Sequence, residues 1–253
     1  VNGIIYGAYC NSGQTCSCIR RVIALRPIAK TLRDRLVKRI SAIAIRGLDD
    51  KENEIGRIQK ESDKEALLDA VAQAQEEGAE IVTGGEVDAG GKRVSPLLIE
   101  NVRPDMKIMQ EEFMGPYICL CIADSIEEAL DIANGTKYGL TASVWTSDYR
   151  YGEEIAGRLQ AGTVWINDSQ FYHYDLPHGG MKESGYGKTG GHEGLLEFVY
   201  PKLVCVEKST KSNFAWFPYS KEKIEIMRAM LLFKHAPDLK PRIKAFCRLF
   251  LKK

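Results

Sequence analysis

The sequence carries almost no net charge: 35 Lys and Arg residues stand against 34 Asp and Glu residues, for a formal net charge of +1. This balance gives no electrostatic reason for a nucleic-acid partner. No apolar run is long enough to span a bilayer, and no secretory signal pattern opens the chain. The 253 residues are 44% hydrophobic and 27% charged, which is typical of a globular protein with a sizeable core.

Histidine is scarce, with four residues, and the seven cysteines are odd in number. Several cysteines lie in apolar runs such as ICLCIA and LVCVEK, which favours free thiols and a cytoplasmic location over a disulfide framework. A metal site is disfavoured because Cys10, Cys16 and Cys18 lack the paired C-x2-C arms of structural zinc sites. The chain opens at Val1 without a methionine, so we expect it to be a piece of something longer.

Helix and strand patterns alternate along the body of the chain. Helices are predicted at 27–45, 64–77, 125–134 and 148–159, and strands within AEIVTGG and at 117–123, 140–146, 162–167 and 203–208. The strand at 117–123 is apolar throughout, as in a strand buried on both faces. This alternation predicts an α/β domain with a mostly parallel sheet and flanking helices.

Charge and composition change near residue 208. Residues 207–253 hold 12 Lys and Arg against four Asp and Glu, a net of +8, whereas the remainder has 23 against 30, a net of −7. We therefore expect a domain at 1–208 and a basic amphipathic extension at 209–253. The extension is either a surface segment packed on the body or on a neighbouring subunit, or a membrane-surface anchor. The short apolar face at 221–234 favours packing.

The stretch NSGQTC, Asn11 to Cys16, places a cysteine after turn-forming residues, and the following CSCIRRVIAL resembles the start of an ordered element. A thiolate at a loop-to-helix junction can be stabilised by backbone N–H groups, which can also hold an oxyanion. From spacing alone, a nucleophile and a buried structural cysteine both remain open, and burial is the commoner fate.

Several motifs together resemble the aldehyde dehydrogenase superfamily. N-x-G-Q-x-C is similar to its nucleophile motif, and RPDMKIMQEEFMGP to its P-D-M…E-E-x-F-G-P motif. GAEIVTGG, LQAGTVWIND and LPHGGMKESGYGKTGGHEGL lie in the family's order, so the resemblance covers roughly 1–208. It implies NAD(P)-dependent oxidation of an aldehyde to a carboxylic acid, through a thiohemiacetal and a thioester on Cys16, with NAD or NADP as the cofactor.

The resemblance also implies roles for further residues. Glu112 matches the position that holds the nicotinamide ribose, and Met114 replaces a phenylalanine beside the cofactor. By the resemblance, Asn167 lies near the substrate tunnel, and Phe171, Tyr172 and Tyr174 help to shape its entrance. Such a lining suits an apolar or aromatic aldehyde.

In the family the general base, a second oxyanion donor and most of the nucleotide site lie upstream of the cysteine. The chain is therefore expected to be the C-terminal, catalytic half, incomplete relative to the full fold and inactive alone. Its expected partners are the missing half, an aldehyde, and further copies of the chain through a strand at 203–208. Two alternatives stay open: a non-catalytic truncated interaction module, and a cysteine-dependent esterase or acyl-transferase.

Overall fold

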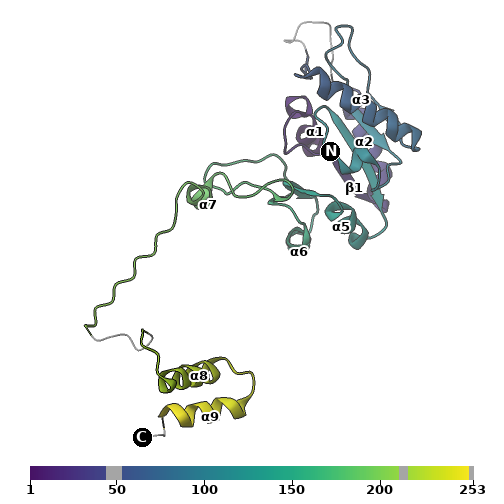
Figure 1. Cartoon of the computed structure of the whole chain (residues 1–253). Coiled ribbons are helices and arrows are strands. Elements are labelled where there is room, and N and C mark those ends of the chain that lie inside the picture. Colours follow the sequence, from purple (N-terminus) through teal and green to yellow (C-terminus); the bar gives the residue numbers. More distant parts are fainter. Residues whose placement is uncertain (44–52, 211–215, 251–253) are drawn as a thin grey trace. The chain divides into compact units, whose positions relative to one another are not determined.

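The computed structural model describes residues 1–43, 53–210 and 216–250. They divide into two compact units, Val1–Tyr200 and Pro201–Lys253 (Figure 1). The elements of the first unit are α1 (Asn2–Tyr9), η1 (Cys10–Gly13), β1 (Arg21–Leu25), α2 (Arg26–Ile40), α3 (Glu61–Glu76), β2 (Glu80–Thr83), β3 (Leu97–Glu100), α4 (Lys107–Gln110), β4 (Tyr117–Ala123), α5 (Ile126–Asn134), β5 (Tyr138–Gly139), β6 (Thr141–Val144), α6 (Tyr149–Arg158), β7 (Thr163–Ile166), β8 (Met181–Lys182) and α7 (Gly191–Leu196).

A four-stranded sheet with the order β1-β4-β3-β2 forms the centre of this unit. Both β1 and β3 run parallel to β4, and β2 runs antiparallel to β3. Arg21 pairs with Cys119, and Leu97 pairs with Tyr117. Two short pairs complete the unit, β6 parallel to β7 and β5 antiparallel to β8. The predicted fold class, α/β with a mostly parallel sheet, is confirmed.

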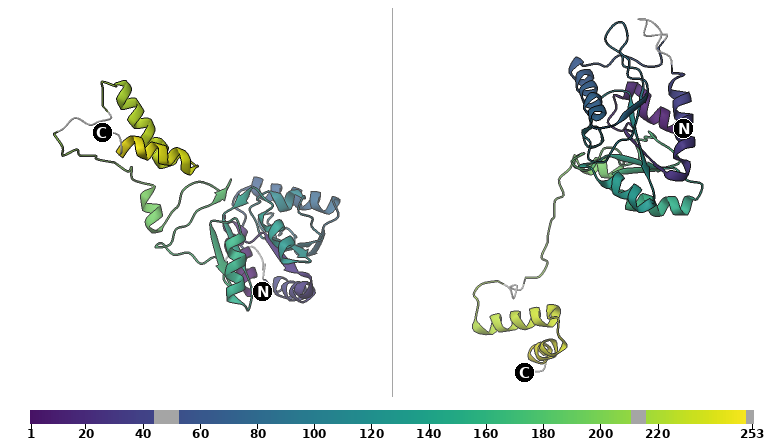
Figure 2. Two further views of the ribbon diagram at one scale, coloured as in Figure 1. Left: turned by 90° about the horizontal axis from the view of Figure 1, so that it is seen from below. Right: turned by 90° about the vertical axis from the view of Figure 1, so that its right-hand side faces the viewer.

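Helices cover both faces of the four-stranded sheet. On one face, Ile118 and Leu120 of β4 belong to the buried cluster that also contains residues of α1 and α2. On the other face, Tyr117, Cys119 and Cys121 pack with residues of α3, α4 and α5. The right-hand view of Figure 2 shows α2 and α3 on opposite sides of the strands. Strand β4 is thus buried on both faces, as its sequence predicted, except at Ile122, which is 44% exposed.

Two of the predicted helices begin with a capping side chain. The Ser125 hydroxyl accepts a 3.1 Å hydrogen bond from the Glu128 amide at the start of α5, and Asp148 accepts one of 3.1 Å from the Tyr151 amide at the start of α6. The helix predicted at 27–45 is α2, whose last two predicted residues lie outside the described residues. Helix α3 begins at Glu61, before the predicted start at 64.

Residues 201–210 form no strand in this chain, and Leu203, Val204 and Val206 are exposed. The oligomerisation strand expected at 203–208 would pair with another subunit, so it stays a prediction. The division between the units falls at Tyr200, ahead of the boundary expected at 208.

The described residues of the second unit contain two helices, α8 (Lys221–His235) and α9 (Leu239–Phe250), packed against each other. Ala229 and Ala245 are buried between them, and the rings of Phe233, Phe246 and Phe250 form a cluster. Among the described residues, none of the helices combines the length and apolar character needed to cross a membrane.

Candidate active site

Cys16 lies at the tip of a tight turn, and its side chain is exposed. The Cys18 amide donates a 3.0 Å hydrogen bond to the Thr15 carbonyl, which closes a β-turn with Cys16 and Ser17 in its central positions. Within the described part of the chain, the Cys16 backbone N–H donates no hydrogen bond. The thiol is therefore open to a reactant, and an N–H group beside it is available to an oxyanion.

The residues before the turn adopt an unusual backbone. Asn11, Ser12 and Gly13 have φ angles of 50°, 59° and 70°, all in the left-handed region. The Ser12 hydroxyl accepts a 2.7 Å hydrogen bond from the Gly56 amide, which helps to hold this conformation. At Gly13 a Cβ atom would lie 2.0 Å from the Gly115 carbonyl oxygen, so only glycine fits there.

The segment after Cys16 differs from one sequence expectation. The loop-to-helix junction expected there is a loop-to-strand junction, because β1 begins at Arg21 and the 3-10 helix η1 lies before the cysteine. The β-branched residues Val22 and Ile23 favour a strand, and pairing with β4 fixes it. Stabilisation of a thiolate by a helix N-terminus therefore does not apply to Cys16.

The loop that carries Cys16 is joined by hydrogen bonds to the loop that carries Glu112. The Gly115 amide donates a 3.2 Å hydrogen bond to the Gly13 carbonyl. The Arg20 guanidinium donates to the Gly13 carbonyl and, over 2.6 Å, to the Gly115 carbonyl. It also lies 4.9 Å from the centre of the Tyr117 ring. One cation thus fixes two loops that are distant in sequence.

The two adjacent glutamates of this second loop differ in their partners. Glu111 accepts a 3.0 Å hydrogen bond from the Lys137 ammonium, which lowers the pKa of that carboxyl below its ordinary value. Glu112 is exposed and, within the described residues, forms neither a hydrogen bond nor an ion pair. Its carboxylate is thus open to the hydroxyl groups of a sugar, and the half-buried Met114 lies two residues further on.

Sequence reasoning missed Gln170, which links the loop after β7 to the nucleophile turn. Its side-chain oxygen accepts a 2.6 Å hydrogen bond from the Ser17 hydroxyl, and its side-chain nitrogen donates to the carbonyls of Ser17 (2.7 Å) and Gly7 (3.1 Å). No local pattern could have identified these contacts, because Ser17 and Gln170 are 153 positions apart.

The predicted aromatic residues come directly after Gln170. Phe171 is 54% exposed, and its carbonyl accepts a 3.0 Å hydrogen bond from the Trp165 indole. Tyr172 is 57% exposed, and its ring meets that of His178 edge-on at 5.5 Å. Gln170 thus places the start of an exposed aromatic segment beside the turn that carries Cys16.

Asn167 has a structural partner. Its amide oxygen accepts a 2.8 Å hydrogen bond from the Thr146 amide, and its amide nitrogen donates a 2.7 Å bond to the Thr146 carbonyl. Asn167 has a φ of 58° and directly follows β7. Its two hydrogen bonds to Thr146 hold the segments that follow β6 and β7 together. Its role near the substrate stays a prediction.

The other thiols of the first unit differ from Cys16 in their surroundings. Burial and the neighbouring Cys18 raise the pKa of Cys10 to about 11. Burial raises the pKa of Cys119 to about 12. Cys18, Cys119 and Cys121 are buried, whereas Cys16 is exposed. Because a nucleophilic thiol must be accessible to its reactant, the exposed Cys16 is the candidate nucleophile of this unit.

The model of the aldehyde dehydrogenase family matches residues 1–204. The chain belongs to this family. The chloroplastic betaine aldehyde dehydrogenase of Amaranthus hypochondriacus is 34% identical over 215 residues, covering 84% of this chain and 43% of that protein. The 4,4'-diapolycopene aldehyde oxidase of a Methylomonas species is 32% identical over 241 residues, covering 92% of this chain and 44% of that protein. The NAD+ complex of an aldehyde dehydrogenase from Bacillus cereus superimposes with a TM-score of 0.73 at 37% identity, covering 77% of this chain and 40% of that one.

The chain thus spans less than half the length of these relatives and covers only part of the family fold. The resemblance inferred from the motifs is confirmed. The match to the Methylomonas protein is long enough to enter α8, so part of the second unit has a counterpart there. One relative is chloroplastic by name, and a cytoplasmic location for this chain stays a prediction.

Proposed function

We propose that this chain is the catalytic portion of an NAD(P)-dependent aldehyde dehydrogenase in which Cys16 is the nucleophile. The observation that carries the proposal is an exposed thiol on a turn whose loop is bonded, through Gly13 and Gly115, to the loop of Glu112. A reactive sulfur and a carboxylate suited to a cofactor sugar are thereby held on adjoining loops. The family membership supports this reaction class.

The chemistry proposed for Cys16 is covalent. Its thiolate forms a carbon–sulfur bond with the aldehyde carbon, and the carbonyl oxygen becomes an alkoxide that the Cys16 N–H can stabilise. When bound, NAD(P)+ supplies the acceptor for the hydride that leaves this thiohemiacetal carbon. Cys16 then holds the product as a thioester until water releases the carboxylic acid and restores the thiol.

Glu112 and Met114 are the residues of this chain proposed to hold the cofactor. The exposed Glu112 carboxylate can accept hydrogen bonds from two ribose hydroxyls, and the Met114 thioether can pack on the ring. The general base and the rest of the nucleotide site are proposed to come from the part of the family fold that these 253 residues do not include.

The substrate is proposed to be an apolar or aromatic aldehyde that enters past Phe171 and Tyr172. Both side chains are more than half exposed, and Gln170 holds their segment against the Cys16 turn. Asn167 supports this entrance by clamping the ends of β6 and β7. The names of these two relatives refer to different aldehydes, so the proposed substrate class rests on the aromatic residues alone.

Assembly into a homo-oligomer is proposed through residues 203–208. Leu203, Val204 and Val206 are 86%, 69% and 72% exposed in the single chain. An exposed apolar segment outside any sheet can bury its side chains and satisfy its backbone by adding to the sheet of another subunit.

The decisive experiment compares Cys16→Ala with wild type in the complete gene product that contains this chain. Aldehyde-dependent reduction of NAD+ and of NADP+ is measured by absorbance, with apolar, aromatic and cationic aldehydes. We expect Cys16→Ala to abolish turnover and the matched control Cys247→Ala, which removes an exposed thiol of the second unit, to retain it. Retained turnover in Cys16→Ala would overturn the proposal.

Two other outcomes identify the alternatives. A Cys16-dependent burst of nitrophenol from an activated ester, together with no nucleotide reduction by any aldehyde, would indicate an esterase or acyl-transferase. A gene product that gives neither signal and lacks a nucleotide-binding segment would indicate a non-catalytic interaction module.

A further inference from the structure

Helix α9 carries an apolar stripe that stays largely exposed, although two of its residues contact α8. Leu239, Ile243, Phe246 and Phe250 recur at steps of four, three and four residues, which places them on one face of a helix. Their exposed fractions are 70%, 54%, 42% and 64%. These four residues, called the apolar stripe below, form a contiguous exposed apolar surface along α9.

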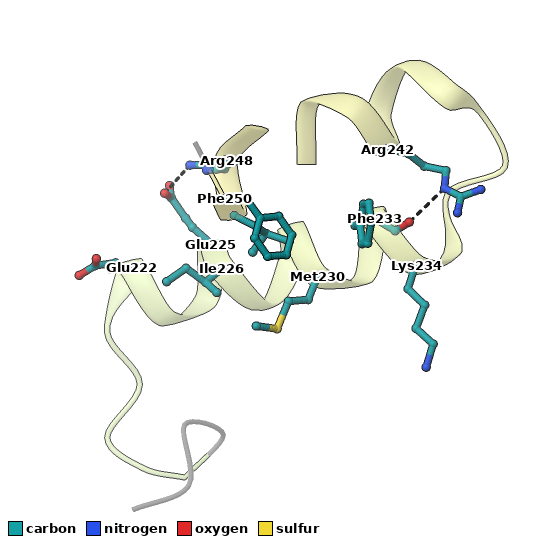
Figure 3. A pocket seen from close by; sticks show the side chains of 10 residues that line it. Glu222, Glu225, Ile226, Met230, Phe233, Lys234, Arg242, Arg248 and Phe250 are labelled. Carbon is teal, nitrogen blue, oxygen red and sulfur yellow. Dashed lines mark hydrogen bonds and ion pairs between the residues drawn. The ribbon is translucent and has the colours of Figure 1, made fainter. Parts of the chain in front are cut away.

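The contact between α8 and α9 covers the apolar stripe only in part: Phe246 and Phe250 meet the ring of Phe233 on α8, whereas Leu239 and Ile243 lie outside this ring cluster. Ala245, on another face of α9, is buried in the contact together with Ala229 of α8. Figure 3 shows the polar links at the two ends of the pair: Arg248 pairs with Glu225, and Arg242 Nε donates a 3.0 Å hydrogen bond to the Phe233 carbonyl. A hollow of about 730 Å³ lies in this pair, and its lining includes Phe250 of the stripe but neither Leu239 nor Ile243.

Positive charge flanks the apolar stripe. Helix α9 contains Lys240, Arg242, Lys244 and Arg248 and no acidic residue. At 100° per residue, Lys240 and Lys244 lie along one side of the stripe. Both are exposed, and neither has an acidic partner in the part of the chain that the structure describes. Their charges are therefore free to meet an anionic surface.

Aromatic residues precede the helix pair. Trp216, Phe217 and Tyr219 are 58%, 81% and 47% exposed, in the short segment before α8. Tryptophan and tyrosine are favoured at the level of lipid headgroups, where their apolar and polar parts are both satisfied. These residues would add to the membrane contact of the helix pair.

We propose that the second unit binds the surface of an anionic lipid bilayer, with α9 lying in the interface. The apolar stripe would enter the boundary between headgroups and acyl chains, and Lys240 and Lys244 would meet anionic headgroups. This binding is peripheral, because no helix among the described residues is suited to span the membrane. It does not depend on the role of Cys16, and it adds a membrane surface to the proposed function.

Vesicle sedimentation tests this proposal on the complete chain. Phosphatidylcholine vesicles are compared with vesicles that also contain phosphatidylserine, at low and high salt. Two double variants are compared with wild type: Leu239→Gln with Ile243→Gln, and Lys240→Glu with Lys244→Glu. Leu239 and Ile243 lie outside the phenylalanine cluster, so their replacement leaves the α8–α9 contact in place, which circular dichroism checks. Tyr186→Gln, at a fully exposed position of the first unit, is the matched control.

Wild type and Tyr186→Gln should sediment with phosphatidylserine vesicles, and high salt should reduce this binding. Each double variant should bind these vesicles at least roughly tenfold more weakly than wild type, because it removes either the inserted side chains or the charges that attract anionic lipid. Equal binding to both vesicle types, or unchanged binding of either double variant, overturns the proposal. A dimer in solution that Leu239→Gln with Ile243→Gln dissociates also overturns it, because a second copy would then cover the stripe.

Discussion

The backbone amide of Gly115 donates a 3.2 Å hydrogen bond to the carbonyl oxygen of Gly13. Gly13 lies three residues before Cys16, and Gly115 lies three residues after Glu112. Arg20 reinforces this contact by donating to both carbonyls. A residue proposed for the chemistry and one proposed for the cofactor are therefore coupled through backbone atoms, which a side-chain substitution at either residue leaves in place.

Replacement of Gly13 by alanine should break this coupling. The added Cβ would meet the Gly115 carbonyl oxygen at 2.0 Å, at a φ of +70° that alanine disfavours. We expect the free energy of unfolding to fall by about 2–4 kcal/mol. Urea denaturation measures this change.

The matched control for Gly13→Ala is Gly157→Ala in α6. A Cβ at Gly157 meets nothing within 4 Å, so this variant should be slightly more stable, by up to about 1 kcal/mol. If the two alanine variants are equally stable, the contact between Gly13 and Gly115 does not hold the loops together.

Gln170 should act as a positioning residue for the turn of Cys16. Gln170→Ala removes three hydrogen bonds to the backbone and hydroxyl of Ser17 and to Gly7. In the complete gene product, we expect kcat to fall by about tenfold to a hundredfold, with a smaller change in KM for the aldehyde, because a displaced nucleophile reacts slowly even when substrate binds. Steady-state kinetics separate the two constants.

A second measurement for Gln170 needs no cofactor. The rate at which iodoacetamide alkylates Cys16 at a fixed pH, followed by peptide mass spectrometry, should change in Gln170→Ala, because the turn that carries the thiol is no longer held. It should not change in Gln73→Ala, which removes a surface hydrogen bond to Glu77 on α3. An unaltered rate of Cys16 alkylation in Gln170→Ala would assign Gln170 a purely structural role.

Alkaline pH should destabilise the first unit through Cys119. Burial raises the pKa of this thiol from 9.0 to about 12, so the folded state keeps a proton that the unfolded state loses. The stabilisation is complete below pH 9 and declines as the pH rises toward 12, by up to about 1.4 kcal/mol per pH unit for such a group.

Urea denaturation at a series of pH values tests the role of Cys119. Cys119→Ala should show a shallower decline above pH 9 than wild type, whereas Cys247→Ala, at an exposed thiol, should behave as wild type. Slopes that agree among all three proteins would show that another buried group, such as Tyr117, governs the alkaline transition.

The sequence predicted the elements whose signals are local. Strand β4 has the predicted bounds because its seven apolar residues suit only a buried strand, and α5 begins where Ser125 can cap it. Helix α1 and strands β1 and β3 were missed. The runs RVIAL and LLIE are short and mixed in propensity, and their pairing with β4 decides their conformation. Tertiary contacts, not local preference, fix these strands.

The candidate site was predictable where it resembles family motifs and unpredictable where it depends on folding. Cys16 and Glu112 were identified from such motifs, whereas the roles of Gln170 and Arg20 come from hydrogen bonds between segments far apart in sequence. The structural role of Asn167 was also not predictable, because its side-chain amide forms hydrogen bonds with the Thr146 backbone only when β6 and β7 are paired.

The register of the parallel pairing between β1 and β4 sets the positions of Cys16 and Glu112 relative to each other. Each strand is entered directly from one of the two loops, and the pairing of Arg21 with Cys119 sets how far each loop extends beyond the sheet. Slippage by two residues would carry Cys16 roughly 6–7 Å along the strand direction relative to Glu112. Insertions and deletions should therefore be tolerated at the exposed tip of the connection between β2 and β3, at Ala89 and Gly90, but not between Cys16 and Arg21.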